Sequence, residues 1–280
     1  MTPEKLRSEG GHTPYPGSRL LRRIRREFRK RRFISLYHKY QQFTMVSKAQ
    51  FMSNLRLCSE FAPATGCIVE CGVWRGGMSA AMAEVLPDRH HLLFDSFEGL
   101  PPAQDIDGVA ALSYQNDKGS PTYFDNCRAE SSFSEKAMAM SPAKDFQLVR
   151  GWFEETLPTF VSPEPIAVLR LDSDWYASTT DCLTYLYPQV MPGGLILIDD
   201  YFVWDGCARA VHDYLSKHKL TDRVHEFNGL CFFIKGEHRQ EMMNPSNGTS
   251  GEARMQHVDV LKVFEESEES RPLHDPSICR

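Results

Sequence analysis

Acidic residues follow two apolar segments of strand length, and their positions suit metal or proton chemistry. The segments span residues 168–171 and 193–198, and a stretch of helical length lies between them. The acidic residues are Asp172 and Asp174 after the first segment, and Asp199 and Asp200 after the second. This order predicts a βαβ unit, whose parallel strands end at the same edge of a sheet. We therefore expect Asp172, Asp199 and Asp200 to converge.

Converging carboxylates need a positive charge nearby. Three close carboxylates repel one another unless a cation or protons intervene. Oxygen-only ligands of this kind suit Mg²⁺ or a similar hard divalent ion. The sequence therefore predicts a metal site at Asp172, Asp199 and Asp200. The alternative is structural: Asp199 and Asp200 cap the following helix, while Asp172 and Asp174 are solvated loop residues.

A glycine-containing turn after an earlier strand predicts a ligand site of a second kind. Residues 67–72 form an apolar segment that contains Glu70 and ends at Gly72. Two further glycines follow, and residues 78–86 have the length of a helix. Strand, glycine turn and helix form the first half of a nucleotide-binding α/β unit. Glycines let the backbone approach a ligand closely, and the start of the helix offers free N–H groups.

The spacing of these glycines favours an adenosine ligand without phosphates. The pattern Glu70-x-Gly72-x-x-x-Gly76 departs from the Gly-x-Gly-x-x-Gly pattern of pyrophosphate sites. Residues 91–95 form a second short strand, and its last residue, Asp95, lies 19 residues after Gly76. That spacing is close to the one expected for the acid that holds a ribose. The alternative is that the glycines only allow a tight turn.

Three further stretches are expected near the same edge of the sheet. Residues 97–125 are polar and rich in Pro and Gly, which predicts a lid or a disordered loop. Residues 146–150 form a third strand, followed by Gly151 and Trp152. Trp152 could stack on a flat ring, although a large aromatic residue beside a sheet is more often a packing residue. The aromatic loop 201–204 either lines a substrate pocket or covers the sheet edge.

Composition and cysteine usage bound the class of protein. The chain has 280 residues, 41% of them apolar and 25% charged, as in soluble globular proteins. Its eight cysteines form no Cys-x-x-Cys pair, which favours free thiols in a reducing compartment. We find no signal-peptide pattern and no apolar stretch long enough to span a membrane, so we expect a cytoplasmic protein. A net charge of −5 gives no general reason to expect a nucleic-acid partner.

We expect an α/β fold in three parts. Residues 1–46 are a basic, partly disordered N-terminal arm, and residues 239–280 are a polar and acidic tail with at most one helix near 258–264. Residues 47–238 form the single folded domain between them. Its sheet is mostly parallel and ends in an antiparallel hairpin, because Asn-Gly interrupts two apolar strands within residues 224–234.

The N-terminal arm contains a concentrated positive charge. Residues 19–32 hold nine Lys or Arg and one Glu. The apolar residues Leu20, Leu21, Ile24 and Phe28 share one side of a helix there. One interpretation of residues 19–33 is a basic amphipathic helix that contacts an anionic membrane surface, an acidic substrate or a partner. We favour the other interpretation, in which the arm packs one side on its own domain or on a second subunit of a homo-oligomer.

Five stretches together resemble the macrocin O-methyltransferase (TylF-type) family. They are Ile-Val-Glu-Cys-Gly-Val-Trp-Arg-Gly-Gly at 68–77, Phe-Asp-Ser-Phe-Glu-Gly-Leu-Pro at 94–101, Gly-Trp-Phe-Glu-Glu-Thr-Leu-Pro at 151–158, Leu-Arg-Leu-Asp-Ser-Asp-Trp-Tyr at 169–176 with Ser178 and Thr179, and residues 186–201 from Leu-Tyr-Pro to Asp-Asp-Tyr. They share one order and spacing with the family across about residues 44–235. The arm and the tail lie outside the stretches that carry the resemblance.

The resemblance implies a class I methyltransferase (Rossmann-like) fold that uses S-adenosylmethionine and Mg²⁺. Members of the family methylate sugar hydroxyls on antibiotics and related glycosides. The implied donor-binding residues are Glu70, Gly72, Asp95, Ser96, Gly151 and Trp152, with Asp95 on the ribose hydroxyls. The implied metal ligands are Asp172, Asp199 and Asp200, and Asp174 competes with Asp172 for its place.

A mechanism follows as a hypothesis. Mg²⁺ on two vicinal substrate oxygens would lower the pKa of the acceptor hydroxyl, and Asp172 would take its proton as the catalytic base. Three other functions stay open. The same chemistry could act on a catechol or another phenol, the chain could bind the donor without turnover, or it could be a surface-binding module that acts through the arm.

Overall fold

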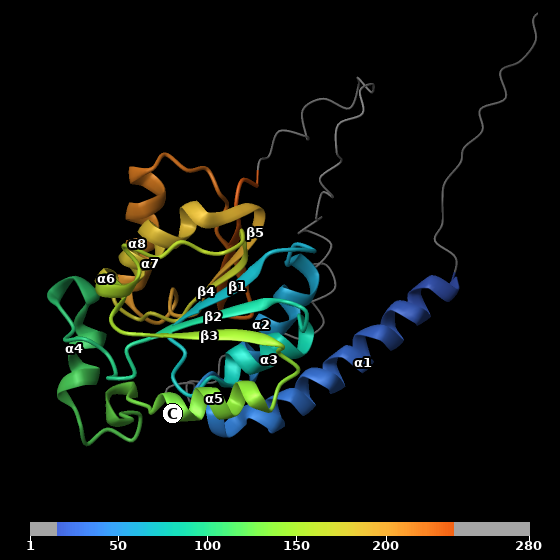
Figure 1. The fold of residues 1–280 in the computed structure, drawn as a ribbon, viewed down its shortest axis with the longest axis horizontal. Coiled ribbons are helices and arrows are strands. Elements are labelled where there is room, and N and C mark those ends of the chain that lie inside the picture. Colours follow the sequence, from blue (N-terminus) through green and yellow to red (C-terminus); the bar gives the residue numbers. More distant parts are fainter. Residues whose placement is uncertain (1–15, 238–280) are drawn as a thin grey trace, which may run out of the picture.

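The computed structural model describes residues 16–237, and side chains from residue 23 onward. A single seven-stranded sheet forms its centre, in the order β3-β2-β1-β4-β5-β7-β6 (Figure 1). The strands are β1 (Cys67–Cys71), β2 (His90–Asp95), β3 (Asp145–Arg150), β4 (Ile166–Leu171), β5 (Val190–Ile198), β6 (His225–Phe227) and β7 (Leu230–Ile234). The first five strands pair in parallel, while β7 pairs antiparallel with both β5 and β6. This confirms the expected mostly parallel sheet with a C-terminal hairpin.

Helices cover both faces of the sheet (Figure 1). One face is covered by α1 (Pro16–Tyr40), α2 (Lys48–Phe61), α3 (Gly77–Val85) and α5 (Ser131–Ala139). The other is covered by α6 (Phe153–Thr156), α7 (Tyr176–Leu186) and α8 (Asp205–Lys217). Because β1 and β4 lie in the middle of this sandwich, every residue of both strands is buried. No helix in the described range has the length and apolar content to cross a membrane.

The crossover between β4 and β5 has the predicted βαβ form. Helix α7 follows β4, and a short 3₁₀ helix (Tyr187–Gln189) leads into β5. Strand β5 begins at Val190, three residues before the apolar segment 193–198 that predicted it. The register against β4 shifts between Ile166 and Val168, which accommodates these residues.

The C-terminal half of α1 belongs to the folded core. Phe33, Leu36 and Tyr40 are buried in the cluster that α2 and α3 complete. The Tyr40 hydroxyl donates to Glu84 Oε1 at 2.9 Å, and Lys39 Nζ lies 2.6 Å from the same oxygen. After α1, a 3₁₀ helix (Gln41–Phe43) leads the chain back to the sheet edge. Residues 33–46 of the expected arm are therefore packed, whereas the expected tail (239–280) lies outside the described residues.

The long polar segment after β2 is folded over the sheet edge. It contains a 3₁₀ helix (Asp105–Asp107), α4 (Val109–Asn116) and a second 3₁₀ helix (Asp125–Cys127). The buried Asp107 carboxylate accepts the backbone N–H of Tyr176 at 2.7 Å. Trp175 Nε1 donates to the Pro101 carbonyl at 2.9 Å. The segment predicted as a lid or a disordered loop is thus held against the start of α7.

Candidate active site

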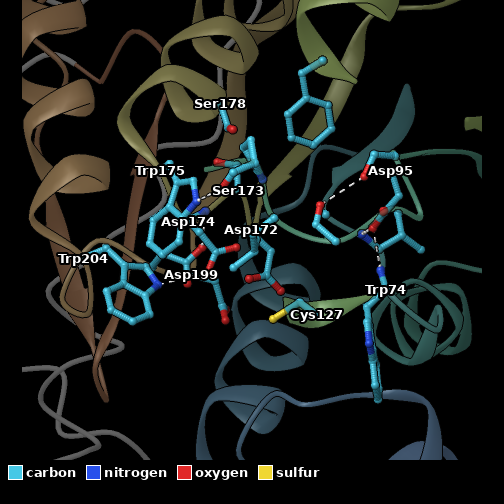
Figure 2. Close-up of a pocket in the computed structure, with 18 of the residues that line it drawn as sticks. Trp74, Asp95, Cys127, Asp172, Ser173, Asp174, Trp175, Ser178, Asp199 and Trp204 are labelled. Atoms are coloured by element: carbon cyan, nitrogen blue, oxygen red, sulfur yellow. Dashed lines mark hydrogen bonds between the residues drawn. The ribbon is translucent and has the colours of Figure 1, made fainter. Parts of the chain in front are cut away.

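A cavity of about 800 Å³ opens at the carboxyl edge of the parallel strands (Figure 2). The ends of β1 to β5 form its floor, residues 43–46 after α1 form one wall, and the folded segment after β2 forms another. All nine site residues expected from the sequence line it: Glu70, Gly72, Asp95, Ser96, Gly151, Trp152, Asp172, Asp199 and Asp200. Asp95 faces the cavity from one side, and Asp172, Asp174 and Asp199 gather on the other (Figure 2).

The glycine turn allows β1 and β4 to end close together. Gly72 has a φ of +84°, and a Cβ there would collide with the backbone carbonyl of Asp172. Glycine is therefore required at this position whether or not a ligand binds. At Gly151, with a φ of +141°, a Cβ would lie 2.8 Å from Thr156 Cγ2. Both glycines let the backbone line the cavity without side-chain bulk.

Asp95 anchors the glycine turn from the end of β2. Its Oδ2 accepts the backbone N–H groups of Val73 at 2.7 Å and Trp74 at 2.8 Å. Its Oδ1 accepts the N–H of Phe97 at 2.6 Å. Burial raises the pKa of Asp95, and these three N–H donors oppose that rise. Because each carboxylate oxygen can accept more than one bond, Asp95 can position the turn and still receive a ligand hydroxyl.

The other site residues expected from the sequence on this side follow the ends of β2 and β3. The Ser96 hydroxyl accepts the Glu98 N–H at 3.1 Å and donates to the Gly99 carbonyl at 3.2 Å, so it stabilises the start of the folded segment after β2. Trp152 precedes α6 and lines the cavity. The Gly151 N–H donates to the Asp95 carbonyl at 3.0 Å, which joins the ends of β2 and β3.

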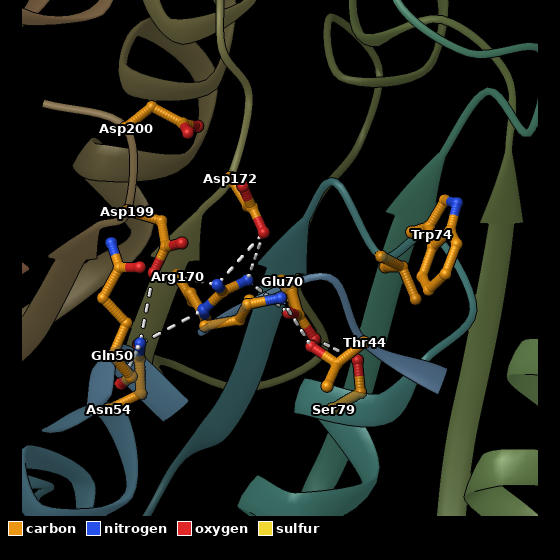
Figure 3. Close-up of polar contacts among 12 residues, drawn as sticks. Thr44, Gln50, Asn54, Glu70, Trp74, Ser79, Arg170, Asp172, Asp199 and Asp200 are labelled. Atoms are coloured by element: carbon orange, nitrogen blue, oxygen red, sulfur yellow. Dashed lines mark hydrogen bonds and ion pairs between the residues drawn. The ribbon is translucent and has the colours of Figure 1, made fainter. Parts of the chain in front are cut away.

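A buried arginine connects the two sides of the cavity (Figure 3). Arg170 is the last residue but one of β4 and has no exposed surface. Its Nη1 is 2.6 Å from Glu70 Oε1, and its Nη2 is 3.1 Å from Asp172 Oδ2 and 3.0 Å from Asp199 Oδ1. Its Nε donates to Asn54 Oδ1 at 3.2 Å, and the Asn54 amide donates to Asp199 Oδ1 at 3.1 Å. One guanidinium thus orients three carboxylates.

Burial and repulsion raise the pKa of these acids. Burial raises the pKa of Glu70 to about 7, although Arg170 and the Ser79 hydroxyl favour the charged form. Burial also raises the pKa of Asp172 to about 6, against the effect of Arg170. Without added positive charge, both carboxyl groups are partly protonated near neutral pH. A cationic ligand would favour their ionised forms.

The three carboxylates that come closest together are those of Asp172, Asp174 and Asp200. One oxygen from each lies within 4.8 Å of the others. Asp200 Oδ2 accepts the Asp174 N–H at 3.0 Å, and Asp174 Oδ1 accepts Trp204 Nε1 at 3.0 Å. Burial and the neighbouring carboxylates raise the pKa of Asp174 to about 8 and that of Asp200 strongly. A hard cation fits this oxygen-only group.

This group differs by one member from the set expected from the sequence, which held Asp199 in place of Asp174. Asp199 lies beside the group but faces Arg170, while Asp200 lies farther from the arginine (Figure 3). Oδ1 of Asp199 is occupied by Asn54 and Arg170. Asp174 has a φ of +55°, and this uncommon backbone conformation accompanies its approach to Asp200. The sequence pattern left both Asp172 and Asp174 as candidates for one ligand position and did not predict that both join the group.

Several cavity residues were not anticipated. Thr44, Met45 and Val46 come from the segment assigned to the arm, which had no motif to mark it. Tyr114 lies in α4 of the folded segment after β2 and packs against Trp204, with ring centroids 5.8 Å apart. Trp204 in turn contacts Trp175 at 5.1 Å, so these aromatic residues build one wall. The signal for Arg170 was present, since it is the only charged residue in an otherwise apolar strand.

The charged residues that line the cavity are all acidic. Ten lining residues are acidic: Glu70, Asp95, Glu98, Asp107, Glu154, Asp172, Asp174, Asp181, Asp199 and Asp200. Among the described residues, no Lys, Arg or His lines the cavity. Such a lining favours cationic ligands and disfavours phosphates and nucleic acids.

Comparison with known proteins gives matches over most of the chain. The family model described as Macrocin-O-methyltransferase (TylF) matches residues 21–235, so it extends into the basic arm. The 8-demethyl-8-(2,3-dimethoxy-alpha-L-rhamnosyl)-tetracenomycin-C 4'-O-methyltransferase of Streptomyces olivaceus is 35% identical over 197 residues, which are 65% of this chain and 71% of that protein. Mycinamicin III 3''-O-methyltransferase of Micromonospora griseorubida is 34% identical over 191 residues, covering 63% and 72%.

Solved structures agree on the fold. The O-methyltransferase NovP matches with a TM-score of 0.59 and 28% identity, over 70% of this chain and 83% of that one. The calicheamicin methyltransferase CalS11 matches with a TM-score of 0.56 and 19% identity, over 81% and 88% of the two chains. At that identity the second likeness concerns the fold alone. The expected class I methyltransferase fold is confirmed.

Proposed function

Because the chain belongs to the macrocin O-methyltransferase (TylF) family and is an S-adenosylmethionine-dependent O-methyltransferase, we propose that its acceptor is a sugar hydroxyl on a glycosylated natural product. The observation that carries this proposal is the acidic lining of the cavity, which lacks a described basic residue. A sulfonium donor and a divalent cation suit such a lining. An acceptor activated by a nucleoside diphosphate would add negative charge, so a sugar already attached to its product is favoured.

The donor would occupy the side of the cavity formed by β1, β2 and β3. Asp95 is available to accept the ribose hydroxyls, and Gly72 allows the ligand to approach the backbone at the end of β1. Ser96, Gly151 and Trp152 are the residues proposed around the adenine. Glu70 would face the donor from the cavity floor, because Arg170 and Ser79 hold its carboxylate there. Its negative charge would favour the sulfonium.

A divalent ion such as Mg²⁺ would be held by Asp172, Asp174 and Asp200, with Asp199 as the alternative to Asp174. The fit rests on the donor set, since these side chains offer only oxygen atoms and repel one another without a cation. When bound, such an ion would lower the pKa of the acceptor hydroxyl and orient it.

The methyl transfer itself needs a base and an aligned hydroxyl. We assign the base to Asp172, whose Oδ2 is held by Arg170 and whose side chain is 28% exposed. The acceptor oxygen would form its bond to the methyl carbon while the carbon–sulfur bond breaks. The hydroxyl proton would pass to Asp172, and the sulfur would leave as a neutral thioether. The aromatic wall of Tyr114, Trp175 and Trp204 would exclude water and hold the sugar face.

Calorimetric titration of S-adenosylmethionine, together with a methyl-transfer assay on glycoside acceptors, tests these roles. Asp95→Asn should weaken donor binding, because a ribose acceptor is lost. Asp172→Asn should bind the donor nearly as the wild type does and lose transfer by roughly 10²–10⁴-fold, which is the usual contribution of a positioned base. Equal loss of donor binding in both variants would contradict the division of the cavity into two sides.

A further inference from the structure

In the N-terminal half of α1, the apolar side of the helix does not face the domain. The side of α1 that faces the body runs through Arg29, Phe33, Leu36 and Tyr40, at helical spacings of three and four residues. Arg29 is half-buried and pairs with Glu60 at 2.9 Å. At the N-terminal half, charged residues therefore occupy the inward side, and α1 extends past the body of the molecule (Figure 1).

Apolar residues of this half face away from the domain. Ile24 is 41% exposed and Phe28 is 69% exposed, and the two lie one turn apart. Phe28 precedes the buried Phe33 by five residues, which places the two side chains about 140° apart around the helix axis. Ile24 and Phe28 border a shallow hollow of about 260 Å³ together with Arg23, Glu27 and Arg31. The domain leaves this apolar face uncovered in the described chain.

The residues around this face carry a strong positive charge. Arg23, Arg25 and Arg31 form no ion pair with the residues that the structure describes. A second copy of α1 on the same face would bring two such basic helices together, and their repulsion disfavours that arrangement. An anionic surface offers the complementary charge and a place for exposed apolar side chains.

We infer that the N-terminal half of α1 is a membrane-surface anchor for anionic phospholipid bilayers. Phe28 and Ile24 enter the headgroup boundary, and the flanking basic residues contact lipid phosphates. At 1.5 Å per residue, Tyr40 lies about 18 Å from Phe28 along the helix axis, and the core contacts of α1 begin between them at Phe33. Tyr40 is followed by the residues that line the cavity, so binding places the cavity near the bilayer.

Flotation of the full chain with lipid vesicles tests this inference, without dependence on methyl transfer. Phosphatidylcholine vesicles are compared with vesicles that also contain phosphatidylglycerol. The wild type should bind only the anionic vesicles, and high salt should weaken binding. Ile24→Ser with Phe28→Ser should abolish it. Arg23→Gln with Arg31→Gln should lower it roughly twenty-fivefold, at about fivefold for each basic residue.

The matched control places the same charge change on another surface. Lys217→Gln with Arg223→Gln removes two exposed basic residues from the far end of α8 and the loop after it, and it should leave binding unchanged. Equal loss in the control, or equal binding to neutral vesicles, would overturn the inference. So would concentration-dependent dimerisation that Phe28→Ser removes, because a second copy would then cover the face.

The acidic tail of the chain is the other possible occupant of this face. Glu265, Glu266, Glu268 and Glu269 give it complementary charge. If the wild type fails to bind anionic vesicles and replacing these four residues by Gln permits binding, the tail covers the face and the membrane inference is wrong.

Discussion

Replacing Arg170 by Met is the perturbation with the most clearly defined consequence. The guanidinium is fully buried and lies within 3.1 Å of carboxylate oxygens of Glu70, Asp172 and Asp199. Met keeps much of the volume and removes the charge. Glu70 and Asp199, which are 1% and 6% exposed, then lack their positive partner inside the protein.

The expected cost is a large part of the protein's stability. Removing one partner of a buried ion pair costs about 3–5 kcal/mol, because the other charge stays buried without compensation. Domains of ordinary stability unfold with about 5–15 kcal/mol. Arg150→Met is the matched control: Arg150 pairs with Glu98 at 3.1 Å, but both side chains are largely exposed, at 63% and 45%. Exposed pairs of this kind contribute about 0–1 kcal/mol.

The pH dependence of the loss has a definite sign. Glu70 already has a pKa raised to about 7 by burial, and Arg170 opposes that rise. Without Arg170, the folded-state pKa of Glu70 lies still further above its unfolded value, so the folded state binds the extra proton. The resulting stabilisation grows as the pH falls through the folded-state pKa. The deficit of the Met variant should therefore be larger at pH 8 than at pH 5.

Urea unfolding followed by circular dichroism measures the free energy of unfolding of the wild type and both variants at the two pH values. We expect the Arg170→Met deficit to exceed that of Arg150→Met by at least about 2 kcal/mol at pH 8. The reasoning is refuted if the two variants lose the same amount, or if the deficit of Arg170→Met grows at acidic pH.

Three further predictions concern the turn, a buried histidine and the metal group. Gly72→Ala should destabilise the fold by about 2–6 kcal/mol through collision and backbone strain, whereas Gly193→Ala, with a φ of +78° and open space, should cost about 1–2 kcal/mol in urea unfolding. Burial lowers the pKa of His91 to about 4, so the folded state resists protonation of this histidine. The free energy of unfolding should therefore fall by up to about 3 kcal/mol between pH 6.5 and 4 because of His91. His91→Leu should lack this contribution to the pH dependence, and an unchanged pH slope in the variant would contradict the prediction. Asp174→Asn should weaken Mg²⁺ binding by roughly tenfold or more in calorimetry, while Asp199→Asn mainly lowers stability; the reverse outcome would favour the ligand set expected from the sequence.

The sequence was sufficient to predict which edge of the sheet forms the site and which acidic residues lie there. Asp95, Asp172 and Asp199 each follow an apolar strand, and the connection rules for parallel strands bring such ends to one edge. The resemblance then supplied the donor and the class of reaction. These inferences depend on local patterns and on topology, both of which can be read along the chain.

The sequence was not sufficient where side-chain direction depends on distant partners. Asp174 joins Asp200 through a backbone conformation with a φ of +55°, which no neighbouring glycine or proline marks. Arg170 meets Glu70 from β1 and Asn54 from α2, residues that lie 100 and 116 positions away. The apolar side of the arm was visible at Ile24 and Phe28, but its rotation relative to the core depends on how α1 docks. These two residues do not pack on their own domain, and packing of this side on a second subunit, the other half of our preferred interpretation, stays a prediction.

The most direct test of the central claim is a methyl-transfer assay by mass spectrometry, with S-adenosylmethionine, Mg²⁺ and matched pairs of a glycoside and its sugar-free aglycone. The account predicts that a glycoside gains one methyl group on its sugar, that the aglycone gains none, and that Asp172→Asn loses the transfer while still binding the donor. Methylation of the aglycone at the same rate, or full activity of Asp172→Asn, would contradict it.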